Sequence, residues 1–142
     1  MSTTRQFNIR LTDEGFAWLD RLRNGRAKQF RQDLAALRLI MVAEADALNG
    51  RFTESEARWL CDVLRGLDPA RNDIRTVVAE ALEVMRWGMG APAPGLADKI
   101  EALSPGGAYW LWHQAQLFWS PDAEAFGADE YERVRRLFRT KE

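Results

Sequence analysis

The stretch "RQFNIRLTDEG" at residues 5–15 alternates polar and apolar side chains. The apolar side chains fall on one side, at Phe7, Ile9 and Leu11. The polar side chains fall on the other side, at Gln6, Asn8 and Arg10. A period of two residues predicts a half-buried β-strand. Because Gln, Asn and Arg pair bidentately with base edges, the exposed face of this strand is predicted to contact DNA.

Two helices are predicted to follow this strand. Thr12 is a good N-cap residue, and the next two residues are acidic, as the first turn of a helix favours. Asn24 and Gly25 are predicted to end that helix, and a longer helix with two apolar faces is expected from about 27 to 48. A lone strand leaves its backbone groups unpaired, so a homodimer with two paired strands is expected.

This order of elements resembles a known family. "QFNIRLTDE" at residues 6–14, followed by "NGRAKQF" at residues 24–30, is similar to the ribbon–helix–helix (Arc/MetJ-type) DNA-binding proteins. The resemblance implies that two chains pair their strands into a ribbon that enters the major groove. The fold expected is mainly α: a dimeric ribbon–helix–helix unit of one strand and two helices, followed by a small helical bundle.

The resemblance also implies which residues contact DNA. The base contacts it implies come from the exposed strand face, at Gln6, Asn8 and Arg10. The phosphate contacts it implies come from the start of the second helix, at Arg26, Ala27, Lys28 and Gln29.

The charge distribution is uneven along the chain. Residues 1–42 contain eight Lys and Arg against four Asp and Glu, a net charge of +4 within a chain whose total is −1. The remaining residues therefore carry −5. A basic segment joined to an acidic one favours a polyanionic partner such as double-stranded DNA.

Two domains are expected: a DNA-binding and dimerisation unit at 1–48, and a helical C-terminal domain at 49–142. In the second domain, Thr53 and Glu56 form a capping box, and Ser104 with Pro105 marks another helix start. The helix that follows, "GGAYWLWHQAQLFWS" at residues 106–120, is apolar nearly all round. It is therefore either core or covered by another chain. Its candidate partner-binding residues are Tyr109, Trp112 and Trp119.

Composition excludes several other classes. With a single cysteine, Cys61, and a single histidine, His113, the sequence predicts no internal disulfide, no metal cluster and no cofactor. No apolar run approaches the roughly 20 residues that span a bilayer, and no signal peptide is evident. We therefore expect a cytoplasmic protein with no membrane partner that is not an enzyme.

These observations predict a dimeric, sequence-specific DNA-binding transcriptional repressor that regulates its own expression in a plasmid, phage or similar mobile element. Two alternatives rely on protein–protein binding through the C-terminal helices. One is an inhibitor of a host protein, of the anti-defence type, and the other is an antitoxin that binds a toxin.

Overall fold

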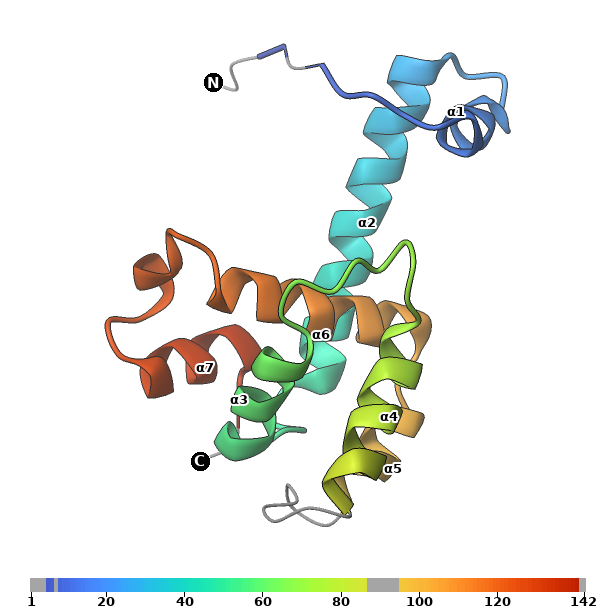
Figure 1. Cartoon of the computed structure of the whole chain (residues 1–142). Coiled ribbons are helices and arrows are strands. Elements are labelled where there is room, and N and C mark those ends of the chain that lie inside the picture. Colours follow the sequence, from blue (N-terminus) through green and yellow to red (C-terminus); the bar gives the residue numbers. More distant parts are fainter. Residues whose placement is uncertain (1–4, 7, 87–94, 141–142) are drawn as a thin grey trace. The chain divides into compact units, whose positions relative to one another are not determined.

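The structure is a computed structural model that describes residues 5–6, 8–86 and 95–140. The chain divides into two compact units, which we call unit 1 (Met1–Leu39) and unit 2 (Ile40–Glu142). The described residues form seven α-helices and one 3₁₀ helix (Figure 1). In chain order these are α1 (Asp13–Asp20), α2 (Arg26–Leu48), α3 (Glu54–Val63), α4 (Ile74–Arg86), α5 (Leu96–Glu101), α6 (Pro105–Phe118), η1 (Ala123–Phe126) and α7 (Glu130–Phe138).

The predicted N-terminal strand is absent, and the ribbon–helix–helix prediction is wrong. Residues 8–12 are coil, Phe7 lies outside the described residues, and no β-strand occurs anywhere in the described ranges. Alternation gives a segment the period of a strand, but a strand forms only when its backbone pairs with a second one. The described part of the chain supplies no such second strand. The mainly α part of the prediction is confirmed.

The helices of unit 1 begin where the sequence predicts. The Thr12 hydroxyl accepts a hydrogen bond from the Gly15 N–H at 3.2 Å and caps α1. The helix ends at Asp20, before the predicted Asn24–Gly25 turn. Gly25, with a φ of +80°, then leads into α2, because a positive φ is open to glycine at little cost.

Unit 1 buries very little. Among its described residues only Leu19, at 8% exposed, and Gln29, at 2% exposed, are buried. Phe16 and Leu22 repeat with Leu19 at three-residue steps in the sequence, as a buried helical stripe would, but both are exposed. Leu22 lies beyond the end of α1, so the helical repeat cannot bring it to the same face. Unit 1 is therefore a two-helix unit without an apolar core of its own.

Unit 2 has an extensive apolar core. Figure 1 shows α6 lying across the unit, with α3 and α7 packed near its C-terminal half and α4 near its N-terminal half. The Trp110 ring of α6 meets the Phe138 ring of α7 edge to face at 5.9 Å. The largest fully buried apolar side chains are Phe52, Phe118, Phe138, Leu60, Leu64, Leu96, Leu111, Val78 and Val134. Of the two alternatives for the aromatic helix, a place in the core is the one observed.

The first turn of α6 contacts the carboxylate of Glu44. Ser104 caps the helix as predicted and also donates its hydroxyl proton to Glu44 Oε1 at 2.8 Å. A Cβ at Gly106 would lie 2.7 Å from that same oxygen, so glycine lets Glu44 approach. The acidic side chain also stabilises the positive end of the helix dipole. The contact joins the second half of α2 to α6.

The predicted capping box at α3 is confirmed. The Thr53 hydroxyl accepts from the Glu56 N–H, and Glu56 Oε1 accepts from the Thr53 N–H at 2.9 Å. Glu56 is fully buried, and the same oxygen accepts from Lys99 Nζ of α5 at 2.7 Å. This ion pair ties α5 to the start of α3.

Candidate functional site

The predicted base-contacting residues lie in an exposed N-terminal segment. Gln6, Asn8 and Arg10 are all exposed and lie in coil. Ile9 is also exposed, at 49%, so the alternation does not separate a buried side from an exposed side. The three polar side chains make no hydrogen bond or ion pair to the described residues. Their donors and acceptors are therefore open to a ligand.

A polar network centred on Asp33 holds α1 against α2. The Arg21 guanidinium donates to both carboxylate oxygens of Asp33, at 2.6 and 3.0 Å. The Trp18 indole N–H donates to the same carboxylate at 3.2 Å, and the buried Gln29 side-chain amide donates at 3.0 Å. Asn24 in turn donates to Gln29 Oε1 at 2.9 Å. Polar bonds thus replace the apolar packing that usually joins two helices.

This network changes the acidity of Asp33. The hydrogen bonds from Arg21 above all, with those from Gln29 and Trp18, lower the pKa of Asp33 to about 2. The same partnership raises the pKa of Arg21. The Arg21 guanidinium also lies 3.9 Å from the centre of the Trp18 ring, in cation–π contact. Arg21 is consequently committed to the structure of unit 1.

The four predicted phosphate contacts at the start of α2 differ in what they offer. Arg26 forms an ion pair with Asp20 at 2.9 Å and stacks over Phe16 at 4.5 Å. The Gln29 backbone N–H donates to Gly25 O at 2.9 Å, and its side chain is buried. Ala27 and Lys28 are exposed, and Lys28 makes no ion pair within the described residues. The structure thus brings all four residues to one helix end, with Lys28 as the uncommitted charge.

Unit 1 carries a group of exposed basic residues. Six of them make no ion pair within the described ranges: Arg5, Arg10, Arg23, Lys28, Arg31 and Arg38. Two exposed acids, Asp13 and Glu14, are likewise unpaired in those ranges. Most of the positive charge of unit 1 is therefore exposed to solvent. Ion pairs within the described residues neutralise only a small part of it.

The predicted partner-binding aromatics of α6 are used within unit 2. The Trp112 indole N–H donates to Leu67 O at 2.7 Å, and the Trp119 indole N–H donates to Cys61 O at 2.8 Å. Tyr109 is half-buried, with its ring centre 5.4 Å from that of Trp112. These contacts give Trp112 and Trp119 structural roles that the sequence does not reveal.

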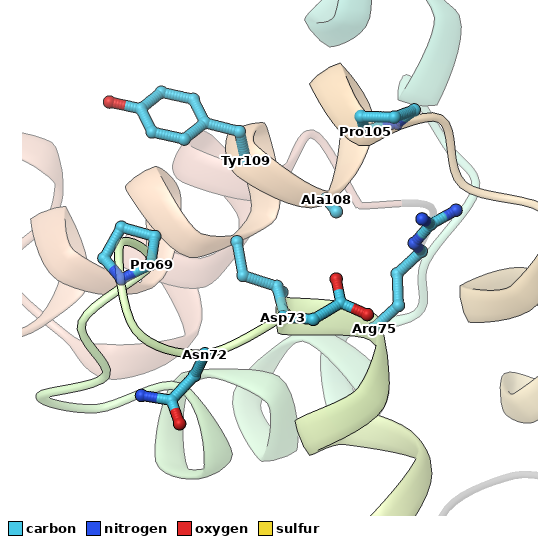
Figure 2. Close-up of a pocket in the computed structure, with 8 residues that line it drawn as sticks. Pro69, Asn72, Asp73, Arg75, Pro105, Ala108 and Tyr109 are labelled. Carbon is cyan, nitrogen blue, oxygen red and sulfur yellow. The ribbon is translucent and has the colours of Figure 1, made fainter. Parts of the chain in front are cut away.

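One shallow pocket of unit 2 lies beside Tyr109. It has a volume of about 210 Å³ and is formed between the start of α6 and the segment that leads into α4. Figure 2 shows Tyr109 and Pro105 on α6, with Asp73 and Arg75 on the facing segment. The Arg75 guanidinium donates to Leu103 O at 3.2 Å, and Asp73 accepts from the Thr76 hydroxyl at 2.6 Å. Both charged side chains thus have partners in the protein.

The chemistry expected of a thiol nucleophile or a metal centre does not appear in the described residues. Cys61 is fully buried, and burial raises the pKa of its thiol to about 12, so the thiolate is scarce at neutral pH. No group of His, Cys, Asp and Glu side chains within the described ranges is arranged to hold a metal ion. Nor does any helix there have the length and apolar character required to cross a bilayer.

Two features of the described structure were not predicted from the sequence. Asp33 follows Gln29 by one helical turn, but nothing in the sequence identifies Arg21 and Trp18 as its partners. The second feature is the run "LAALRLIMVA" at residues 34–43, which contains a single charged residue and is largely exposed. Its composition is visible in the sequence, whereas its exposure is not.

Comparisons of the chain with family models, curated proteins and solved structures gave no match.

Proposed function

We propose that this chain is a DNA-binding protein and that unit 1 is the part that contacts double-stranded DNA. The observation that carries the proposal is the set of six exposed basic side chains in unit 1 that lack ion-pair partners within the described residues. DNA presents a phosphate charge along each strand at regular spacing, and unpaired Lys and Arg side chains bind it by releasing counterions.

The N-terminal segment supplies the groups that would read sequence. Gln6, Asn8 and Arg10 are exposed, and their side chains match adenine and guanine edges. Contact does not require a sheet, because basic N-terminal arms also enter DNA grooves as extended chain. We assign base contact to this segment and phosphate contact to Lys28 and Arg31 on α2. That the bound site is an operator, and that binding represses transcription, stays a prediction.

The proposal is tested by binding of a fluorescently labelled duplex from the DNA upstream of its own coding sequence. If the five of these basic side chains other than Arg10 contact phosphate, affinity falls about 500-fold between roughly 50 and 200 mM salt. The double variant Lys28→Gln/Arg31→Gln should reduce the slope of log affinity against log salt by about 2. The matched control is Arg51→Gln, an exposed arginine of unit 2 without an ion pair in the described residues.

A second arm tests base reading. Arg10→Ala should weaken binding to the preferred duplex by about 1–3 kcal/mol and should leave binding to a scrambled duplex much less affected. Absence of binding at the lower salt concentration would overturn the proposal, as would a salt slope that Lys28→Gln/Arg31→Gln leaves unchanged.

A further inference from the structure

Within unit 1, one face of α2 is basic. Three basic side chains and one alanine follow one another along it at steps of three, four and three residues: Lys28, Arg31, Ala35 and Arg38. Steps of this size return a helix to the same side, so the four residues lie in one row. All four are exposed, and the three charged side chains form no ion pair within the described residues. We call this row the basic face.

The basic face points away from α1. Asp33 is the only acid among the residues of α2 that belong to unit 1, and its carboxylate accepts from Arg21 and Trp18. Leu37 lines a groove formed between α1 and α2. Asp33 and Leu37 each lie two residues from Ala35, which places them about 200° round the helix from it. Contacts with α1 therefore leave the basic face open, and its acid lies on the opposite side of the helix.

The length of the basic face suits the major groove of double-stranded DNA. Along the helix axis, Lys28 and Arg38 are about 15 Å apart, and Arg31 and Arg38 are about 10.5 Å apart. The major groove is about 12 Å wide and admits an α-helix. Lys28 and Arg31 can therefore reach phosphates on one edge of the groove while Arg38 reaches the other edge. Ala35 lies between them, and its small side chain lets the helix approach the base edges.

Gln32 supplies a base-reading side chain beside the basic face. It is exposed and lies four residues from Lys28 and three from Ala35, one helical turn from each. The Asn24 side-chain amide donates to Gln32 Oε1 at 3.0 Å. This bond orients the Gln32 amide and leaves its two N–H donors without an acceptor in the described residues. In the major groove such donors meet acceptors on base edges, the N7 of adenine and guanine among them.

We propose that α2 enters the major groove of DNA with its basic face, and that Gln32, oriented by Asn24, donates to a purine N7 there. This inference rests on the proposed DNA binding, and it adds a helix to the base contacts assigned to the N-terminal segment. The charges favour DNA over an acidic protein, because unpaired cations at the two ends of the face match two phosphate edges. Between those cations, the amide of Gln32 suits base edges.

Removal of a single atom from the DNA tests the groove and the donor. In the preferred duplex, replacement of one purine by its 7-deaza analogue removes the N7 acceptor from the major groove and leaves the phosphates intact. At the base that Gln32 contacts, this replacement should weaken binding by the native chain about tenfold. Binding by Gln32→Ala should be unaffected by the same replacement, since the donor is already absent.

A new carboxylate tests the basic face. Ala35→Glu places a negative charge at the middle of the face with a residue that favours helix, and it should weaken binding to every duplex at least tenfold by repelling phosphate. The matched control is Val84→Glu in α4, an exposed position in unit 2, and it should leave binding unchanged. Arg38→Gln should lower the slope of log affinity against log salt by about 1. Circular dichroism of each variant shows whether its helices are intact.

Asn24→Ala tests whether Asn24 acts as a positioning residue. We expect it to reduce the discrimination between the preferred and a scrambled duplex, and to have no further effect on that discrimination in Gln32→Ala. A merely structural role would instead weaken binding to both duplexes alike.

The outcomes separate this inference from the proposed function. The inference is overturned if Ala35→Glu and Val84→Glu bind DNA alike, or if no 7-deaza position distinguishes the native chain from Gln32→Ala. Salt-sensitive binding that Lys28→Gln/Arg31→Gln weakens would then still support the proposed function. A chain that binds no duplex overturns both.

Discussion

The helix α6 and the middle of α2 are both apolar nearly all round, and they differ in what surrounds them. α6 buries Trp110, Leu111 and Phe118 against α3, α4 and α7 of its own unit. The middle of α2 has the same kind of composition, yet Leu39 and Val42 are mostly exposed. The comparison teaches that composition alone does not make a core helix. A core helix needs neighbours on every side, and the described residues provide them for α6 but not for residues 34–40 of α2.

The contacts that stabilise unit 1 internally also differ from those that stabilise unit 2. Unit 2 uses buried apolar side chains, whereas unit 1 joins its helices through the Asp33 network and one buried leucine. Polar bonds at a surface contribute less stability than a packed core, since water competes for every group. We therefore expect unit 2 to determine the global stability and unit 1 to open first.

The largest expected effect comes from a matched pair of leucines. Leu111→Ala, at a fully buried position, should lower the free energy of unfolding of unit 2 by about 2–5 kcal/mol. Leu39→Ala should change it by less than about 0.5 kcal/mol, because that side chain is 73% exposed. Urea unfolding followed by tryptophan fluorescence measures both, since only Trp18 of the six tryptophans lies in unit 1. If both substitutions lowered the free energy of unfolding equally, the contrast between a buried position in unit 2 and an exposed one in unit 1 would be wrong.

A pair of helix caps should give a smaller difference. Thr53→Ala removes the capping box of α3 and should cost unit 2 about 0.5–2 kcal/mol. Thr12→Ala removes the cap of α1, and we expect faster amide exchange within α1 without a change in the unfolding midpoint of unit 2. Thermal unfolding and hydrogen exchange of both variants distinguish these outcomes. A common shift in midpoint would show that the units unfold together.

Acidification should act on unit 1 through Asp33. Its pKa is lowered to about 2 in the folded state, so its contribution is complete above its ordinary value of 3.8 and is lost as the pH falls toward 2. The NMR signal of the Trp18 indole N–H, which donates to Asp33, should therefore shift over this range. Asp33→Asn should abolish that pH dependence, whereas Asp68→Asn, in unit 2, should preserve it. A transition that survives Asp33→Asn would assign it to another group.

The smallest effect is expected at Cys61. Burial and a thiol pKa of about 12 should prevent alkylation by iodoacetamide at pH 8 in the folded chain, with full reaction in urea. Mass spectrometry of the intact chain measures this. Rapid labelling of the folded chain would show that the α3 region of unit 2 opens as readily as unit 1.

The sequence predicts the helices well because their signals are local. Thr12, Thr53 and Ser104 each cap the helix that they were expected to cap, since one side-chain oxygen and a nearby N–H suffice. The two apolar faces of residues 27–48 likewise identify α2. Neither signal depends on the rest of the chain.

The strand prediction failed because a strand is not local. The alternation at residues 5–11 describes side chains, whereas a strand requires a partner backbone that the described residues do not provide. The Asp33 network was unpredictable for a related reason. It joins Trp18 and Arg21 at the end of α1 to a carboxylate 12 or 15 residues later, through bonds that no repeat encodes.

The prediction of the DNA-contacting residues depends partly on local residue chemistry and partly on the fold. Residue chemistry singles out Gln6, Asn8 and Arg10, and the structure leaves all three exposed. It also shows that Arg26 is paired with Asp20, whereas the sequence alone treats every basic residue as equally available. Lys28 and Arg31 are thus better choices for mutation than Arg26.

Unit 2 has a packed apolar core, whereas polar contacts hold the helices of unit 1 together, and hydrogen exchange of the intact chain measures the consequence of that difference. We predict that the amides of α1 exchange much faster than those of α3 and α6, because unit 1 opens without the unfolding of unit 2. Equal protection of α1 and α6 would contradict this account.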